Sequence, residues 1–217
     1  MKQYTTKENI LEALNSRYAV KIFDKNKKVS AEDIHTILES ARLSPSSSGT
    51  EMWKFIVVEN PEVRARLLAV SENQPKVTDA SHLIVLTYRT DALENMIKER
   101  LERTAKIQNQ EVSDLGGLKK VLEGGLAKHQ NAGDLSAWLK AQTYIPLGIM
   151  IETASLLGVD NCAMEGFDND KVDEILGLKE KNLKSVTMLA LGYRGEDPAA
   201  NRPKVRREFG DVVEFIK

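Results

Sequence analysis

Two stretches of the chain, residues 83–88 and 186–193, are almost entirely apolar. Successive side chains of a strand point to opposite faces of its sheet, so a strand without polar positions has to be covered on both faces. The chain therefore needs helices on both sides of a sheet. Shorter apolar runs at residues 55–58 and 159–164 predict two further strands.

Helices are predicted before and between these strands. Ile34, Ile37, Leu38 and Ala41 stand at i, i+3, i+4 and i+7, the spacing of one helix face. Comparable patterns and cap residues predict further helices at about residues 5–16, 61–70, 91–101, 134–157 and 170–176. Helices come first and then alternate with strands. This order indicates one domain over residues 1–217, of α+β or α/β class, with a sheet of four or five strands between helices.

Glycine and proline predict interruptions of this pattern. Gly116-Gly117 and Gly124-Gly125 predict irregular structure or a mobile flap in the middle of the chain. Pro146 predicts a kink in the helix over residues 134–157, unless a new helix begins there.

The charge balance excludes some classes of partner. Lys and Arg number 31 and Asp and Glu 32, so the net charge is −1 and composition indicates no binding to nucleic acid or to an anionic membrane. The single cysteine, Cys162, allows no intrachain disulfide, which fits a reducing compartment. The first residues lack the apolar core of a signal peptide, and residues 144–159 are too short and polar to span a bilayer. We therefore expect a cytoplasmic protein.

Several common catalytic motifs are absent from the sequence. There is no Walker P-loop and no G-x-G-x-x-G after a strand, which argues against a Rossmann nicotinamide site. The chain has three histidines and no H-E-x-x-H, so no metal is expected.

Two clusters early in the chain could carry chemistry. Arg17-Tyr18-Ala19-Val20-Lys21 follows the first helix, although basic residues there also complement the helix dipole. The loop Ser46-Ser47-Ser48-Gly49-Thr50 offers hydroxyl and backbone N–H groups, although most such loops are connections only.

Two further clusters lie late in the chain. Met164-Glu165-Gly166-Phe167 stands at the carboxyl end of a predicted strand, where ligands often bind, and Gly166 would let a flat ligand approach the backbone. A tight turn with a solvated glutamate is the alternative. Arg202-Pro203-Lys204-Val205-Arg206-Arg207 holds four cations in six residues, which suits a phosphate, or else a solvated basic tail.

In this order and spacing, the four clusters resemble the nitroreductase family of FMN-dependent oxidoreductases. The resemblance extends from about Arg17 to Arg206 and rests on four pieces: Ser44-Pro45-Ser46-Ser47-Ser48 followed by Trp53, Asp79-Ala80-Ser81-His82, Glu165-Gly166-Phe167, and Pro203-Lys204-x-Arg206. It implies an α+β three-layer sandwich with a central mixed sheet of four to five strands, built as an intertwined homodimer with FMN at the interface. It also implies that a C-terminal arm, about residues 200–217, is exchanged with the partner subunit.

The resemblance assigns a role to individual residues. Arg17, Lys204 and Arg206 resemble the family's phosphate contacts, and Lys21 resembles the cation at the N1/O2 edge of the flavin ring, where it would favour the negatively charged reduced state. Asn73 and Lys76 match positions at the ring's polar edge. Glu165 and Gly166 match the segment against the isoalloxazine. Ser46, Ser47 and Gly49 would reach the FMN held mainly by the other subunit, and the flavin-binding segments also contain Tyr18, Ala19 and Met164.

This sequence departs from the family pattern at four places. Ala19 stands where Ser or Thr is usual, Gly49 where Asn is common, and Met52 where Pro is common. Gly124-Gly125 replaces bulky aromatic residues that several relatives place over the ring. A glycine-lined entrance would be wider, so substrate preference is left open.

The activity implied by the resemblance is NAD(P)H oxidation coupled by FMN to the reduction of a small-molecule acceptor. Hydride would pass to the flavin, and a nitroaromatic or quinone acceptor would then be reduced at the same face in a ping-pong sequence. The alternatives are a flavin reductase, enone reductase or dehalogenase-like enzyme on the same fold, a non-enzymatic FMN-binding redox protein, and a helical interaction protein with a basic tail. NADH and NADPH are not distinguished.

Overall fold

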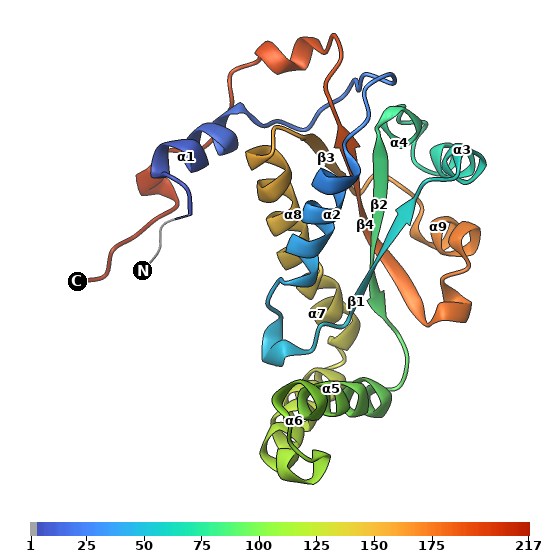
Figure 1. Cartoon of the computed structure of the whole chain (residues 1–217), viewed down its shortest axis with the longest axis vertical. Helices are drawn as coiled ribbons and strands as arrows, with labels where there is room; N and C mark the ends of the chain where they lie inside the picture. Colours follow the sequence, from blue (N-terminus) through green and yellow to red (C-terminus); the bar gives the residue numbers. More distant parts are fainter. Residues whose placement is uncertain (1–3) are drawn as a thin grey trace.

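The computed structural model describes residues 4–217. Its helices and strands follow the chain in the order α1 (Lys7–Ser16), α2 (Ala31–Arg42), β1 (Trp53–Val58), α3 (Pro61–Ala69), α4 (Lys76–Asp79), β2 (His82–Arg89), α5 (Leu93–Gln108), α6 (Gly116–Ala132), α7 (Leu135–Gln142), α8 (Tyr144–Leu156), β3 (Asp160–Met164), α9 (Asn169–Leu176) and β4 (Leu183–Gly192). Short 3₁₀ turns include η1 (Ser47–Gly49), η4 (Pro198–Asn201) and η5 (Phe209–Asp211). Helices lie on both sides of the sheet, which confirms the predicted α+β sandwich (Figure 1).

The four strands form one sheet in the order β1-β2-β4-β3, and each neighbouring pair is antiparallel. The strand number agrees with the prediction, but the expected mixed strand directions need correction. Among residues 4–217, parallel pairing is limited to an isolated bridge between Ala19 and Asn161. The reason lies in the connections: α3 and α4 return the chain to the end of the sheet that it has just left, whereas a parallel neighbour would need a crossover to the opposite end.

Both faces of the sheet are covered, as the apolar strands require. Leu83 and Val85 of β2 belong to a core cluster with α3, α4 and α9, whereas Ile84 and Leu86 belong to a second cluster with α2 and α8. All four side chains are fully buried, which stabilises the fold by about 1.5–3 kcal/mol for each.

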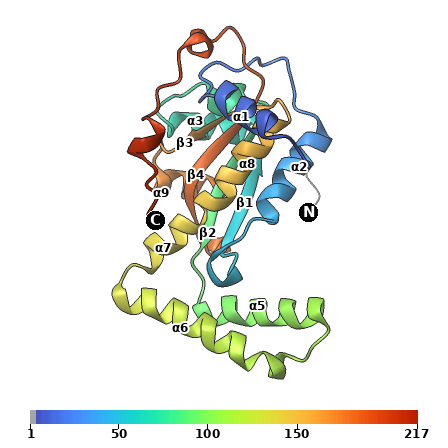
Figure 2. The same cartoon turned by 90° about the vertical axis from the view of Figure 1, so that its left-hand side faces the viewer.

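A helical arm formed by α5 and α6 extends beyond one end of the sheet (Figure 2). The prediction of irregular structure at the glycine pairs is wrong here, because α6 is a helix of 17 residues that contains both pairs. Leu122 and Leu126 of α6 are buried against α5 in a third apolar cluster. That burial offsets the cost of helical glycine, about 0.5–1 kcal/mol for each.

The single helix predicted over residues 134–157 is divided into two helices, α7 and α8. α7 ends at Gln142 and α8 begins at Tyr144. Pro146 lies in the first turn of α8, where its missing N–H costs little. The alternative that Pro146 marks a new helix is therefore confirmed.

The C-terminal arm, residues 200–217, projects from the body on the same side as α1 (Figures 1 and 2). Its described residues form turns and extended backbone but no strand. Phe215 and Ile216 are 73% and 85% exposed. The strand-prone composition is not realised in a single chain because a strand at an edge needs a neighbour with which to pair. No helix within residues 4–217 is long and apolar enough to cross a membrane.

Candidate functional site

The first predicted cluster forms an extended segment after α1, residues 17–22, which we call the N-terminal strap. Arg17 ends α1 because its backbone is extended, with φ −70° and ψ 142°. Ala19 forms the parallel bridge with Asn161 of β3, and the Val20 N–H donates to the Asn161 carbonyl at 3.3 Å. Since β3 is an outer strand of the sheet, the strap lies along the sheet's edge.

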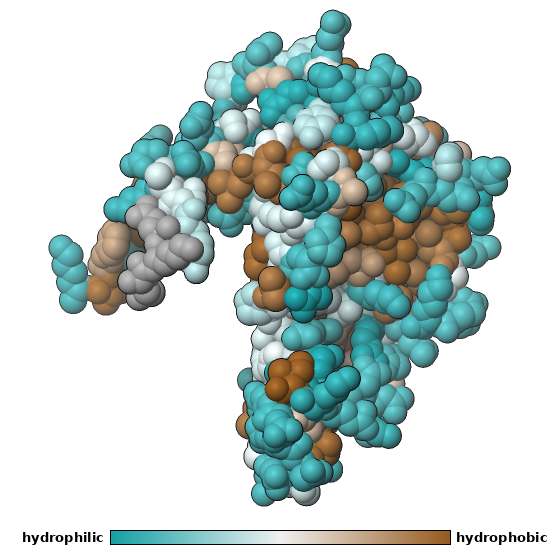
Figure 3. Space-filling view, viewed as in Figure 1, coloured by the Kyte–Doolittle hydropathy of each residue, from teal (hydrophilic) through white to brown (hydrophobic). Residues whose placement is uncertain are grey.

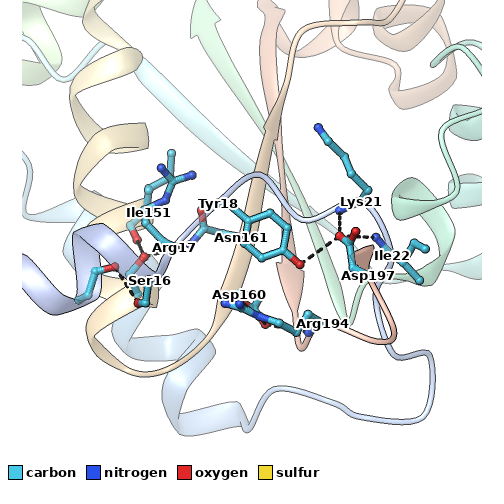
Figure 4. Close-up of polar contacts among 12 residues, drawn as sticks. Ser16, Arg17, Tyr18, Lys21, Ile22, Ile151, Asp160, Asn161, Arg194 and Asp197 are labelled. Carbon is cyan, nitrogen blue, oxygen red and sulfur yellow. Dashed lines mark hydrogen bonds and ion pairs between the residues drawn. The ribbon is translucent and has the colours of Figure 1, made fainter. Parts of the chain in front are cut away.

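One carboxylate, Asp197, holds the strap from the other side (Figure 4). Its Oδ2 accepts hydrogen bonds from the Tyr18 hydroxyl at 3.0 Å, the Lys21 N–H at 2.7 Å and the Ile22 N–H at 3.3 Å. Its Oδ1 accepts from the Ala199 N–H at 2.9 Å and so caps η4. Burial alone would raise the pKa of the Asp197 carboxyl, but these hydrogen bonds outweigh burial and lower the pKa below its ordinary value.

The ring of Tyr18 is fixed by a second contact. The Arg194 guanidinium lies over it, 4.8 Å from the ring centroid, and is itself paired with Asp160. Burial and the hydrogen bond to Asp197 raise the pKa of Tyr18 to about 12, so the hydroxyl stays a donor at neutral pH. The strap is therefore tied to both β3 and the segment after β4.

Beside the strap, a cleft of about 350 Å³ lies between the end of α1 and the C-terminal arm. Its lining includes five of the predicted site residues and a further cation, Arg202, but among the described lining residues no Asp or Glu. The predicted residues that meet there are Arg17, Tyr18, Ala19, Lys204 and Arg206. The structure thus brings the first and last clusters together although they are separated by most of the chain.

The positive charges in this cleft lack a compensating anion among the described residues. The Arg17 Nε is buried and has no hydrogen-bond partner there. Burial and the nearby Arg206 lower the pKa of Arg17, while burial, Arg17 and Arg206 lower the pKa of Lys204. Buried donors of this kind cost stability unless they are paired, so the cleft is suited to an anion that carries several acceptor oxygens.

The two cations of the C-terminal arm are placed differently. The Lys204 ammonium donates to the Leu14 carbonyl at 2.9 Å and also to the Arg17 carbonyl, so it closes the carboxyl end of α1. Arg206 is exposed and donates to the neighbouring Val205 carbonyl at 2.7 Å. Lys204 therefore holds the arm against α1, while the Arg206 guanidinium is largely free to meet a ligand.

The third cluster lies beyond the carboxyl end of β3. Glu165 is exposed and accepts a hydrogen bond from the Tyr144 hydroxyl at the start of α8. Burial and this bond raise the pKa of Tyr144 to about 12. Met164 is 4% exposed and packs in the core, so its side chain does not face the cleft. Tyr144 was not proposed from the sequence, because no local pattern links it to Glu165, which lies 21 residues further along the chain.

Gly166 is packed tightly against the loop that precedes α4. Its carbonyl accepts from the Gln74 side chain at 2.9 Å, and a Cβ at this position would lie 2.9 Å from the Glu72 carboxylate. The loop also carries Asn73, exposed with φ 51°, and leads to Lys76, which is 8% exposed. The structure therefore joins the predicted ring-edge positions to the segment after β3.

The Ser46, Ser47 and Gly49 loop is not part of this arrangement within one chain. It lies at the end of α2 away from the strap, as both views show (Figures 1 and 2). The Ser47 N–H donates to the Gln142 side chain at 2.9 Å, and Gly49 (φ 62°) lies against the Arg100 side chain. Within one chain, Ser46, Ser47 and Gly49 do not line the cleft. Nowhere in residues 4–217 do three or more His, Cys, Asp or Glu side chains form a group that could hold a metal.

The chain is similar to known proteins both in sequence and in fold. A model of the Nitroreductase family matches residues 14–193. A protein of Staphylococcus haemolyticus named "Putative NAD(P)H nitroreductase" is 37% identical over 216 residues, which is 96% of this chain and 98% of that protein. A nitroreductase-like protein of Streptococcus mutans superposes with a TM-score of 0.84 at 20% identity, covering 98% of this chain and 100% of that one. A nitroreductase-type protein of Exiguobacterium sibiricum, solved in complex with FMN, gives a TM-score of 0.78 at 22% identity over 100% of both chains.

Proposed function

The chain belongs to the nitroreductase family, and from this premise we propose that it binds FMN, oxidises NAD(P)H and reduces nitroaromatic, quinone or related acceptors. The observation that carries the proposal is the cationic cleft, in which the Arg17 Nε is buried without a partner. The relative of known structure from Exiguobacterium sibiricum contains FMN, and relatives at 37–38% identity carry NAD(P)H nitroreductase names.

The cleft suits the phosphate of FMN. A phosphate monoester carries a charge of about −1.5 to −2 at neutral pH and three strong acceptor oxygens. Arg17 and Arg206 would donate to it, and Lys204 would add charge while it keeps the arm against α1. The phosphate would offset both the burial and, to a smaller extent, the repulsion between cations that lower the pKa values of Arg17 and Lys204.

Other residues of the chain would hold and tune the ring. Bound FMN would supply the two-electron chemistry between NAD(P)H and the acceptor. Lys21, exposed on the strap, would place positive charge near the ring edge that becomes negative on reduction. Gly166 and its neighbour Glu165, held by Tyr144, would form the wall against which the ring lies. A Cβ at Gly166 would meet the ends of the Glu72 and Gln74 side chains, so a larger residue on that wall would have to displace them.

The phosphate assignment is tested by FMN titration of the apoprotein. Arg206→Ala should raise the dissociation constant about 10-fold or more, since a hydrogen bond to a charged group contributes about 1.5–3 kcal/mol. Arg207→Ala is the matched control, because Arg207 does not line the cleft. An unchanged dissociation constant in Arg206→Ala would refute the assignment.

The ring-edge assignment has a separate test. Lys21→Ala should shift the midpoint potential of the bound flavin to more negative values, because a cation near the reduced ring is lost. A potential equal to that of the parent protein would contradict this role. Steady-state kinetics with nitroaromatic, quinone, enone and free flavin acceptors would then identify the acceptor class, and parallel double-reciprocal lines would support the ping-pong order.

We also propose that the chain acts as a homodimer in which the C-terminal arm, about residues 200–217, is exchanged through its apolar end after Arg207, while Lys204 and Arg206 remain in the cleft of their own chain. β1 is an edge strand, and apolar surface is visible around it in the space-filling view (Figure 3). Trp53 and Phe55 of β1 stack with ring centroids 6.2 Å apart and are only partly buried, while Phe215 and Ile216 of the arm are exposed. Burying both surfaces against a second copy would remove them from water. Sedimentation of a chain ending at Arg207 is the test: a fully stable dimer with bound flavin would refute the exchange.

A further inference from the structure

Asp197 connects the two ends of the candidate site through four hydrogen bonds. Three come from the strap, which is up to 179 residues away in sequence, and one comes from η4, which leads directly into the segment that carries Lys204 and Arg206. Its side chain is 6% exposed, and donors from the protein occupy both oxygens. Asp197 is therefore placed to act through its neighbours rather than by touching a ligand.

The hydrogen bonds fix backbone on both sides of the carboxylate. The N–H groups of Lys21 and Ile22 set the direction in which the Lys21 side chain leaves the strap. In Figure 4, Tyr18 turns toward Asp197, whereas the side chains of Arg17 and Lys21 extend away from it. The Ala199 N–H sets the turn from which the C-terminal arm departs.

We propose that Asp197 is a positioning residue that fixes the strap and the C-terminal arm relative to each other, so that the ring cation and the phosphate cations fit one FMN molecule. The inference rests on the proposed function and deepens it, because it assigns recognition of FMN over riboflavin to a residue that contacts neither part of the ligand.

The direction in which FMN affinity changes on removal of the Asp197 carboxylate distinguishes a positioning role from a charge effect. Asp197 is an anion near a cationic cleft, so its negative charge by itself opposes binding of a phosphate. If charge were its role, removing it would tighten FMN binding. If positioning is its role, removing it weakens FMN binding although the site becomes more positive.

The experiment compares FMN with riboflavin. The dissociation constants of both ligands are measured by fluorescence titration for the parent protein, Asp197→Ala and Asp173→Ala. Asp173 is the matched control because it is also buried, 9% exposed, and also accepts a backbone N–H, that of Ser185 at 2.9 Å, but it lies on α9. We expect Asp197→Ala to weaken FMN binding about 10- to 100-fold and to lower the preference for FMN over riboflavin, while Asp173→Ala leaves that preference unchanged.

Asp197→Asn keeps the test decisive if the alanine variant does not fold. The amide places an NH₂ group against either the Ala199 N–H or the donors of the strap. In either orientation the hydrogen bonds to one of the two segments are lost. The preference for FMN over riboflavin should therefore fall. Equal or tighter FMN binding in the variants, or an equal loss for FMN and riboflavin, overturns the inference. A parent protein that binds neither ligand would instead refute the proposed function.

Discussion

Arg17→Met should strengthen the folded apoprotein while it weakens FMN binding. Arg17 is partly buried, its Nε has no partner among the described residues, and burial and Arg206 lower its pKa. Methionine keeps an unbranched apolar chain of similar reach. The backbone contacts of Arg17, its N–H to Ala13 and its carbonyl to Lys204, do not depend on the side chain.

The magnitudes follow from two opposite contributions. An unsatisfied buried donor costs about 1–3 kcal/mol, and part of the Arg17 side chain is still solvated, so the apoprotein should gain about 1 kcal/mol. For a chain of this size that gain corresponds to roughly 2–4 °C in Tm. The lost contact to phosphate should cost about 1.5–3 kcal/mol, which is about a 10- to 150-fold rise in the FMN dissociation constant.

Two measurements on one variant test the reasoning. Urea unfolding of the apoprotein gives the stability, and fluorescence titration gives the FMN affinity. Arg206→Ala is the comparison, because Arg206 is exposed and bonds only to its own segment, so it should weaken FMN binding without changing apoprotein stability by more than about 0.5 kcal/mol. Lower stability of the Arg17→Met apoprotein, or unchanged FMN affinity, would refute the account of the cleft as an unpaired cation cluster.

Three further predictions concern stability. Gly124→Ala and Gly125→Ala should each raise the unfolding free energy by about 0.5–1 kcal/mol, because a Cβ at either site of α6 meets nothing within 4 Å; a fall in Tm would contradict this. Arg64→Met should cost about 3 kcal/mol or more in urea unfolding, since Arg64 is 7% exposed and donates to three backbone carbonyls at the end of α4; a loss below about 1 kcal/mol would be incompatible with those bonds. Tyr18 and Tyr144 have pKa values of about 12, above the ordinary value near 10, so their contribution to stability is present below pH 10 and is lost as pH rises through about 12. Tyr18→Phe and Tyr144→Phe should each remove a late step from the tyrosinate absorbance titration, and a titration identical to that of the parent would count against the two hydrogen bonds.

Local sequence patterns predicted the elements of the sandwich because their causes are local. The apolar run in β2 required cover on both faces, and the structure provides it through two separate core clusters. The helical spacing of Ile34, Ile37 and Ala41 correctly predicted the buried face of α2. Strand direction was not predicted correctly, because it depends on how α3 and α4 route the chain. The glycine pairs were misjudged because tertiary burial of Leu122 and Leu126 outweighs local propensity.

The candidate site likewise contains residues that the sequence predicted and one that it did not. Arg17, Lys204 and Arg206 were proposed from motif resemblance, and the fold gathers them in one cleft. Asp197 was not proposed, although its position before Pro198 gives a helix N-cap signal that the sequence does contain. What that signal could not reveal is the second role of its carboxylate toward the strap.

Apart from α6, the sequence by itself determined which segments become helices and strands, and it determined which residue types are available for an anionic ligand. Periodicity, capping and side-chain chemistry are properties of neighbouring residues. The tertiary structure decided which cations meet, which one is left unpaired, and that Lys204 closes α1 while Asp197 joins the strap to η4. These are contacts between groups up to 190 residues apart, and they form only when burial of the sheet has brought the two ends of the chain together.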